Sequence, residues 1–486
     1  MNLFNLLLFL SLLMPGDVKS AAGLNCTTDS SNQAYSVDFE SPVCIGAHSD
    51  KKYTSIFINP NSTTTDTLEK TLTLDEAIRI SLENNYGIQI QRNRAEIASN
   101  NRTLGNAGFL PTLTANGSRS GSVEDSRFEL AGADEVSENL GARSTFTNAG
   151  INLSWTLFDG MQMFIGYDRL GELEQLGEEE FRLNLELLVE QVITAYSDVN
   201  RVRDQLEVIE SSIEITRERI EIAETKLDLG TGSEYELLQA RTDLNADRAA
   251  LLREENRLEA ARIRLNELLA RDPLMVFETS SELALNRQLT YDELYNRMVE
   301  ENASLQMARI ESRIAELELR EIRGSRLPEL ELTSGYSYSR TDGGGGFLLF
   351  NETQGFNVGI TARINLFDGF NNRLRVQNAE INRKNSELFV EDELNRLEAT
   401  FARAFRDYEN TLELVDLEQE NLGVAEETLD IALERFRLGA ISNLEFREAQ
   451  RALLNAENRL IEAIFEAKLA ETELLRLSGV LQHIGL

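Results

Sequence analysis

The chain contains few of the residues that metal sites and nucleophilic sites require. Its 486 residues include two cysteines, two histidines and one tryptophan. His48, Cys26 and Cys44 stand in the N-terminal stretch and His483 stands near the C-terminus. None of them has the spacing of a ligand set, or of a nucleophile with its base. We therefore expect no enzyme, no bound metal and no cofactor.

Positive charge is also scarce. The chain has 48 lysines and arginines against 82 aspartates and glutamates, which gives a formal net charge of −34 at pH 7. A nucleic-acid-binding protein needs a basic face that releases counterions from phosphate, so this composition argues against nucleic acid as a partner. Charged molecules attracted to the chain should be cations.

Chain breakers and long apolar runs are rare as well. Only 6 prolines and 30 glycines interrupt the sequence, which predicts long continuous elements rather than many compact domains. No stretch approaches 18 consecutive apolar residues, so the sequence predicts no transmembrane helix.

The N-terminus is typical of an exported protein. Residues 3–14 form a short apolar core, and Ser20-Ala21-Ala22 would suit signal peptidase. We therefore predict a signal peptide over residues 1–22 and a polar periplasmic lead-in over residues 23–72. In an exported chain three states are open to the cysteines: a disulfide between Cys26 and Cys44, a lipid on Cys26, or two unpaired thiols.

From Thr73 onward the sequence repeats itself. The segment TLDEAIRISLENN (73–85) aligns with TYDELYNRMVEEN (290–302) at an offset of 217, and this offset also places Pro111 on Pro328. After the Leu-Phe-Asp-Gly motifs at 157–160 and 366–369 the offset is 209. We therefore predict two structural repeats, 73–289 and 290–480, that differ in length only between the proline and this motif.

The region of unequal length is predicted to be a β-hairpin in each repeat, at about 111–158 and about 328–367. Apolar residues such as Ile151, Leu153 and Trp155 alternate with polar ones, which gives each strand one apolar and one wet face. About ten such residues would cross a bilayer. The edge of a soluble β-sandwich is the alternative. The glycine run at 343–346 suits a hairpin tip better than a phosphate loop, because no Lys-Ser/Thr follows it.

Long helices are predicted after each hairpin. Apolar residues recur at alternating steps of three and four from Leu185 to Leu227, and only Thr216 interrupts this seam. A 3.5-residue repeat of this length is typical of supercoiled packing. Gly230 and Gly439 are placed to end the long helices, and Ser233 with Glu236 and Ser442 with Glu445 form capping-box patterns that would start the returning ones.

Together these motifs resemble the TolC family of outer-membrane efflux channels. The resemblance rests on TLTLDEAI, on FLPTL before the first strand, on Leu-Phe-Asp-Gly before each long helix, and on Leu-Gly-x-x-Ser at its far end. It implies an α+β membrane protein in which a homotrimer closes a 12-stranded β-barrel in the outer membrane, continued by an α-helical barrel through the periplasm. Independently, four strands per chain cannot close a water-filled barrel.

The resemblance also implies partners and a function. The chain would be the exit duct of a tripartite efflux or type I secretion system, coupled through a periplasmic membrane-fusion adaptor to an inner-membrane transporter of RND, ABC or MFS type. Trp155, Tyr336 and Tyr338 would meet outer-membrane lipid. A structural periplasmic coiled-coil protein, or an adaptor-like protein, is the alternative; it would share the heptads but not the repeated amphipathic hairpin.

The resemblance finally implies two groups of functional residues. The adaptor would dock on the turns between the helices, at Leu229, Gly230, Ser233, Leu438, Gly439 and Ser442. The entrance constriction would be lined by Glu445, Glu448, Glu236 and Phe436. Glu445 can instead serve only to cap its helix. The family's basic partner for the aromatic residue is missing at the matching turn position, Ile441, so the closing contacts must differ.

Overall fold

The computed structural model describes residues 71–129, 136–280, 284–343 and 349–481. The chain divides into two units, Met1–Asp66 and Thr67–Leu486, and the described residues all belong to the second. The expected signal peptide, most of the lead-in, and Cys26 and Cys44 lie outside the described residues. None of the described helices is long and apolar enough to span a membrane.

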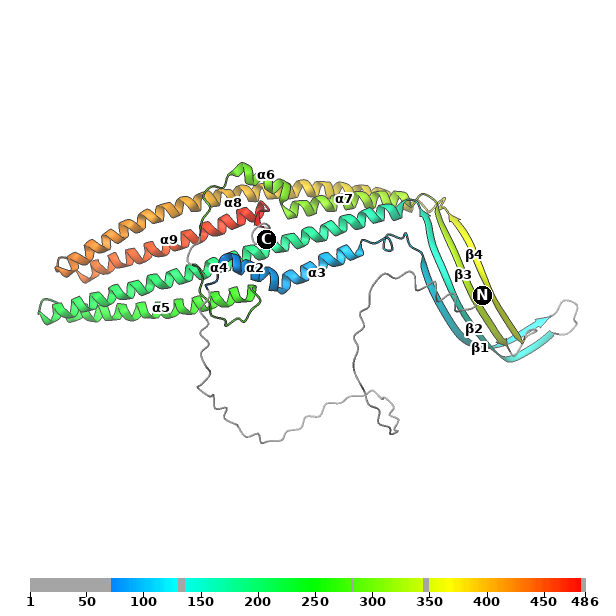
Figure 1. Cartoon of the computed structure of the whole chain (residues 1–486), viewed down its shortest axis with the longest axis horizontal. Coiled ribbons are helices and arrows are strands. Elements are labelled where there is room, and N and C mark those ends of the chain that lie inside the picture. The colour runs from blue at the N-terminus through cyan, green and yellow to red at the C-terminus, as the bar shows by residue number, and fades with distance from the viewer. Residues whose placement is uncertain (1–70, 130–135, 281–283, 344–348, 482–486) are drawn as a thin grey trace, which may run out of the picture. The chain divides into compact units, whose positions relative to one another are not determined.

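The same series of elements occurs twice (Figure 1). The first series is α2 (Leu74–Asn84), α3 (Tyr86–Asn101), β1 (Thr112–Glu129), β2 (Val136–Asp159), α4 (Gln162–Asp228) and α5 (Glu234–Leu268). The second is α6 (Tyr291–Glu301), α7 (Ala303–Gly324), β3 (Glu329–Gly343), β4 (Phe350–Arg363), α8 (Asn371–Arg437) and α9 (Asn443–Leu477). Both long helices have 67 residues and both returning helices have 35, so the offset of 209 holds throughout them.

Asparagine breaks the first helical segment of each series at the same point. The Asn85 side chain accepts a hydrogen bond from the N–H of Ile88 and begins α3. Asn302 does the same for the N–H of Leu305 and begins α7. A side-chain oxygen at this position satisfies one of the N–H groups that a helix start leaves without a partner. The two caps therefore set the same bend in both series.

The strands form one antiparallel sheet in the order β1-β2-β3-β4. Leu113, Ile151 and Trp155 share one face with Tyr336 and Tyr338, and the opposite face carries polar residues such as Asn152 and Thr333. The first hairpin is longer, with strands of 18 and 24 residues against 15 and 14 in the second. The predicted second hairpin extends to about residue 367, whereas β4 ends at Arg363.

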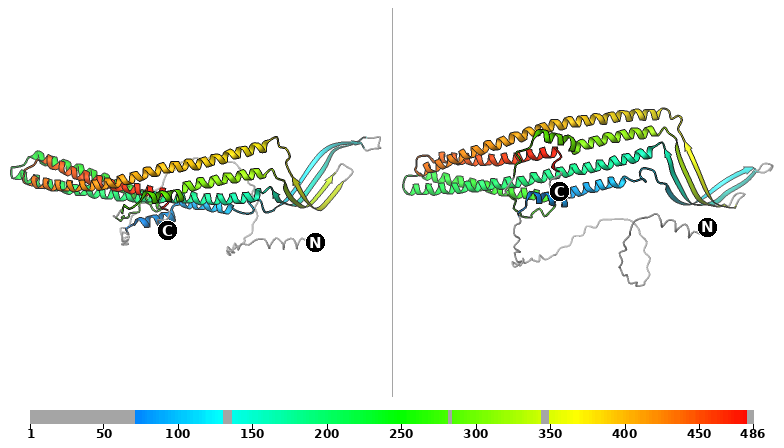
Figure 2. Two further views of the ribbon diagram at one scale, coloured as in Figure 1. Left: turned by 90° about the horizontal axis from the view of Figure 1, so that it is seen from above. Right: turned by 45° about the horizontal axis from the view of Figure 1, so that its top comes forward.

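The long helices are continuous, as the heptads predict, and at about 1.5 Å per residue each spans roughly 100 Å. They run lengthwise with α7 and α9 between them, and the sheet lies at one end and the helical turns at the other (Figures 1 and 2). The predicted seam of α4 is buried at Leu188, Val192, Val199 and Ile213, among others. Its polar exception, Thr216, is buried too.

The apolar core is divided between the two series. One cluster joins α2, the middle of α4 and the end of α5, and includes Ile78, Val192 and Leu265. Another joins α6, α8 and α9, and includes Met298, Phe401 and Leu474. A buried tyrosine ties each cluster to a nearby connection: the hydroxyl of Tyr196 donates to the carbonyl of Leu72 at 2.8 Å, and that of Tyr408 to Asn286 at 2.5 Å.

One contact between the two series lies where strand becomes helix. Gly160, with φ of +73°, follows β2 and sits against the end of α7, so that an added Cβ would lie 2.2 Å from the carbonyl oxygen of Gly324. Only glycine combines this backbone conformation with so close an approach. The contact fixes α4 beside α7 below the sheet.

A buried carboxylate lies in the middle of α4. Glu186 is 1% exposed, and its oxygen lies 3.4 Å from Nε of Arg182, whose guanidinium also donates to the carbonyl of Glu301 at 2.5 Å. Burial raises the pKa of Glu186 from 4.5 to about 7, while Arg182 and Arg476 oppose the shift. The effect of burial on the pKa is the larger one because the charged carboxylate loses its hydration.

We predict that Glu186→Gln removes a pH dependence of stability. Between pH 4.5 and about 7 the folded chain binds a proton at Glu186 that the unfolded chain has released, so the free energy of unfolding falls as pH rises through this window. The loss is up to about 3 kcal/mol. Thermal unfolding in detergent across this range should show a smaller slope for Glu186→Gln, whereas Glu214→Gln, on an exposed position of the same helix, should keep the wild-type slope.

Candidate functional site at the helical turns

The two turns that join the long helices to the returning ones have the same backbone. Gly230 has φ of +72° and Gly439 has φ of +68°, and each ends its helix as predicted. The N–H of Thr231 reaches back to the carbonyl of Lys226, and that of Ala440 to Arg435. An added Cβ would meet nothing within 4 Å at either glycine among the described residues, so the left-handed conformation alone explains the glycines.

The two serine caps differ. At Ser442 the predicted capping box is present: its side chain accepts from the N–H of Glu445, whose carboxylate accepts from the N–H of Ser442 at 2.7 Å. At Ser233 the side chain accepts instead from the N–H of Tyr235 at 3.2 Å, and no capping box is formed there. The pattern at Ser233 was therefore right about the helix start and wrong about the role of Glu236.

The predicted docking residues lie at the end of the helices far from the sheet. Leu229 is 73% exposed and Leu438 is 82% exposed. Neither leucine contributes to an apolar cluster within the described part of the chain. An apolar side chain this exposed at a tight turn is free to be covered by another molecule.

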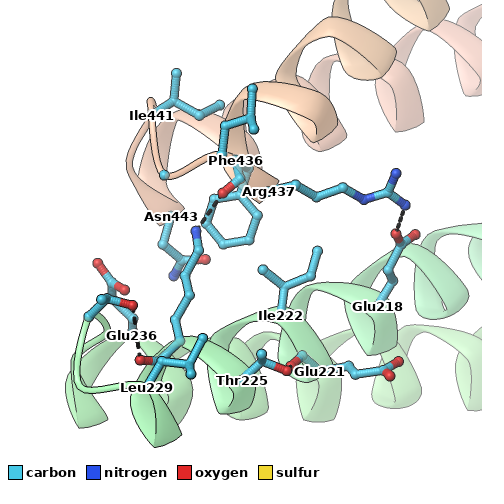
Figure 3. Close-up of a pocket in the computed structure, with 14 residues that line it drawn as sticks. Glu218, Glu221, Ile222, Thr225, Leu229, Glu236, Phe436, Arg437, Ile441 and Asn443 are labelled. Carbon is cyan, nitrogen blue, oxygen red and sulfur yellow. Dashed lines mark hydrogen bonds and ion pairs between the residues drawn. The ribbon is translucent and has the colours of Figure 1, made fainter.

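A groove of ≈ 800 Å³ separates the turns (Figure 3). It is lined from two helical hairpins: the first is α4 with α5, and the second is α8 with α9. Of the predicted residues, Leu229, Glu236, Phe436, Leu438 and Gly439 line it. Glu445 and Glu448 are exposed at the start of α9 and lie outside its lining. The structure therefore brings Phe436 and Glu236 together and leaves the predicted acidic pair on a separate surface.

Phe436 is buried and stacks on Phe446 with their ring centroids 5.1 Å apart. Lys226, from the other hairpin, holds its ammonium 3.9 Å from the Phe436 ring centroid and donates to the Phe436 carbonyl at 2.5 Å. Burial lowers the pKa of Lys226, and the carboxylate of Glu236 opposes that shift. Lys226 is thus a basic residue in contact with Phe436, whereas the turn position expected to hold one is Ile441.

A second cation also crosses the groove. Arg437, the last residue of α8, forms an ion pair with Glu218 of α4, which Figure 3 shows spanning the two hairpins. Neither cation was identified from the sequence, because each acts on a partner more than 200 positions away. The only available signal was that both stand in the last turn of a long helix, where cations are favoured.

Glu445 has two hydrogen bonds that hold its carboxylate at the helix start. The N–H and the hydroxyl of Ser442 both donate to it, and they lower its pKa. Glu448 follows one turn later on the same exposed face. The Glu445 carboxylate is therefore held in its charged form at the helix start, and the Glu448 side chain is exposed beside it.

Known structures of outer-membrane channels share this fold of paired amphipathic strands and long helical hairpins. The chain superimposes on the open state of the MtrE outer membrane channel of Neisseria gonorrhoeae with a TM-score of 0.66, at 17% identity over 84% of this chain and 89% of that one. It superimposes on VceC of Vibrio cholerae with a TM-score of 0.68, at 16% identity over 84% of this chain and 96% of that one.

Related sequences point the same way. The chain is 23% identical to the alkaline protease secretion protein AprF of Pseudomonas aeruginosa over 85% of its length and 86% of the relative. It is 21% identical to the outer membrane protein TolC of Vibrio cholerae over 71% of this chain and 80% of that relative. Residues 77–271 and 294–480 match the outer membrane efflux protein family. The chain belongs to this family: it is an outer-membrane efflux channel, and the family is not one of enzymes.

Proposed function

We propose that three copies of the chain form an exit duct, with twelve strands closing a β-barrel in the outer membrane and the helices enclosing a tunnel in the periplasm. The observation that carries this is the pair of free sheet edges: within the described residues, β1 and β4 each pair on one side only. An unpaired strand edge is costly in a bilayer, and four strands cannot close on themselves.

The strand-to-helix turns support a second copy at this edge. Gly160 is packed against Gly324, whereas its counterpart Gly369, with φ of +68°, has no atom of another described segment within 4 Å of an added Cβ. The offset of 217 maps Gly324 onto Ala107 of the first series. We infer that Gly369 packs against Ala107 of the next copy, which repeats between chains the contact seen within one chain.

Uncovered apolar side chains lie on the two outermost helices. On α3 they include Tyr86, Ile90 and Ile97, and on α8 they include Leu374, Ile381, Leu388 and Phe389, each 49% exposed or more. A heterologous contact between α8 of one copy and α3 of the next would cover both sets and would close a ring. The apolar sheet face, with Trp155, Tyr336 and Tyr338, would then meet lipid.

We predict that a cysteine pair at this contact links the copies. Gln162 lies beside Gly324 within one chain, and the equivalent positions across copies are Asn371 and Ala107. With Cys26 and Cys44 replaced by serine, Asn371→Cys combined with Ala107→Cys should form disulfides between chains and yield covalent trimers on non-reducing gels.

The single variants Asn371→Cys and Ala107→Cys are the controls, and neither should give a covalent trimer. A detergent-independent soluble monomer would contradict the duct and favour the structural coiled-coil alternative. Covalent dimers that never extend to trimers would contradict the closed ring.

We further propose that a periplasmic adaptor docks on the turns and connects the duct to an inner-membrane transporter of RND, ABC or MFS type. The exposure of Leu229 and Leu438 supports this, as does the open groove between the turns. The relatives differ in cargo by name, which includes alkaline protease secretion and cation efflux.

Replacing the turn leucines should weaken adaptor binding. Leu229→Glu and Leu438→Glu keep the glycine turns but place a charge where an apolar contact is expected, so affinity for the adaptor should fall about tenfold or more per site. Leu229→Met and Leu438→Met keep an apolar side chain and should bind normally. Pull-down measures binding of the adaptor, and transport by the complete pump measures function. Unchanged binding by the Glu variants would refute the docking site.

We propose last that Glu445 and Glu448, with Glu236 as the first-series counterpart and Phe436 as the closing aromatic residue, make the entrance prefer cations. Both α9 carboxylates face solvent, and three copies would bring six of them to one level, where they would concentrate counterions. Lys226 holds Phe436 in place from the other hairpin.

Conductance across planar bilayers tests this preference. Glu445→Gln combined with Glu448→Gln should move the reversal potential in a KCl gradient toward zero and should relieve block by polyvalent cations. Glu420→Gln changes an exposed residue of α8 that lies farther from the turn. It should leave both the reversal potential and the block by polyvalent cations unchanged. A double variant as cation-selective as the wild type would show that the preference arises elsewhere.

A further inference from the structure

The apolar face of the sheet carries no charge over most of its length. On β3 this face is formed by Leu330, Leu332, Ser334, Tyr336 and Tyr338. The residues paired with these five on β2 and β4 are uncharged as well. The next residue of β3 on this face, toward the hairpin tip, is Arg340.

The length of this uncharged band fits the thickness of an outer membrane. Arg340 stands ten positions beyond Leu330 in the sequence. At about 3.3 Å per residue and a tilt of about 40°, that length of strand rises roughly 25 Å. The apolar band of an outer-membrane barrel has about this height. Arg340 therefore lies where the band ends, on the side of the hairpin tips.

Arginine gathers at this boundary on three neighbouring strands. Arg119 of β1 and Arg340 of β3 are both paired with Thr147 of β2, one on each side of it. Arg143 lies on the same face of β2, four residues nearer the tip, and all three arginines are exposed. Adjacent strands are about 4.8 Å apart, so the backbones of Arg119 and Arg340 are roughly 10 Å apart. We refer to Arg119, Thr147 and Arg340 as the arginine site.

The two arginines of this site differ in their contacts. Asp342 accepts from Nε and Nη2 of Arg340 at 2.9 and 3.0 Å, and the Arg340 guanidinium lies over the Phe350 ring, 5.0 Å from its centroid. These contacts hold the guanidinium in place and leave its Nη1 for another acceptor. Arg119 takes part in no ion pair within the described strands, whose pairs are Arg127–Glu138, Arg340–Asp342 and Arg363–Glu329.

The charge at this boundary differs from that of the whole chain. Three arginines stand there with two acids, Asp342 and Glu352, whereas the chain has a formal net charge of −34. At the boundary next to the helices, the exposed side chains that follow β4 are Ile364, Leu366 and Phe367. The sheet thus has arginine where it would meet the outer leaflet and apolar side chains where it would meet the inner one.

We propose that the arginine site binds a phosphate group of a phosphorylated glycolipid in the outer leaflet of the outer membrane. In the barrel proposed above, on which this site depends, the apolar face meets lipid and the hairpin tips lie on the outer side. Phosphate fits the site because its oxygens can accept from two guanidinium groups and a hydroxyl together, and the planar fork of arginine suits such contacts. The acyl chains would lie along Tyr336, Tyr338 and Ile151, below the phosphate.

Lipid binding by the assembled trimer tests the site. The full-length channel in detergent is titrated with lipid A that carries both phosphates, or with lipid A from which the phosphates have been removed, and bound lipid is counted by native mass spectrometry. The wild type should bind the phosphorylated form about tenfold more tightly. Arg119→Gln combined with Arg340→Gln should bind both forms alike, because the apolar face that meets the acyl chains is unchanged.

Two further variants serve as checks on this result. Arg119→Gln alone breaks no ion pair of the described strands, so its trimer should assemble, and it should lose most of the preference for phosphate. Arg363→Gln changes an exposed arginine on the opposite face of the same sheet and should keep the wild-type preference. Phosphatidylglycerol, added as a competing anionic lipid, should displace phosphorylated lipid A poorly.

Three results would overturn the site: an assembled wild-type trimer without a preference for phosphate, arginine variants that keep the preference, or equal competition by phosphatidylglycerol. The last would indicate a general attraction between charges. A chain that yields no detergent-dependent trimer would instead contradict the barrel, and the site with it. Failure of the assembly is thus distinguished from failure of the lipid site.

Discussion

The backbone groups on the outer strands impose the constraint on which the rest of the molecule depends. Strands β1 and β4 leave one row of N–H and C=O groups without partners in the described chain. In a bilayer these groups can be satisfied only by more strand. In the proposed ring, a copy that supplies the strand would also bring its helices alongside. It would then cover the bare faces of α3 and α8 and the open turn at Gly369.

Duplication gave the two halves the same lengths without the same cores. Helices α4 and α8 match residue for residue in extent, yet Asp243 and Asp247 stand where the second hairpin has Ala452 and Ala456. The first hairpin thus carries charges inward, and the second packs Phe436, Phe446 and Leu453 together. Two helical hairpins of equal length therefore present different side chains to their neighbours.

Much of this fold was predictable from local sequence signals. The repeated offset, the heptads, the alternating strands and the turn glycines are each set by neighbouring residues, and the structure has the helices and turns where these signals place them. Contacts between distant segments were not predictable. Thr216 was only an exception in a heptad seam, because its partners Asp247 and Gln450 lie 31 and 234 positions away. Lys226 was missed for the same reason. The capping box expected at Ser233 was wrong because its hydroxyl accepts from the N–H of Tyr235 and not from that of Glu236.

The matched helix lengths also restrict how such a chain can evolve. Because both long helices have 67 residues and both returning helices have 35, their turns end at one level. A deletion in one half would lift its turns out of register with the other, and any deletion other than a whole heptad would also rotate the apolar seam away from its neighbour. Lineages can therefore change the helices only by paired, seven-residue steps, whereas the strand connections, which already differ between the halves, are free to vary one residue at a time.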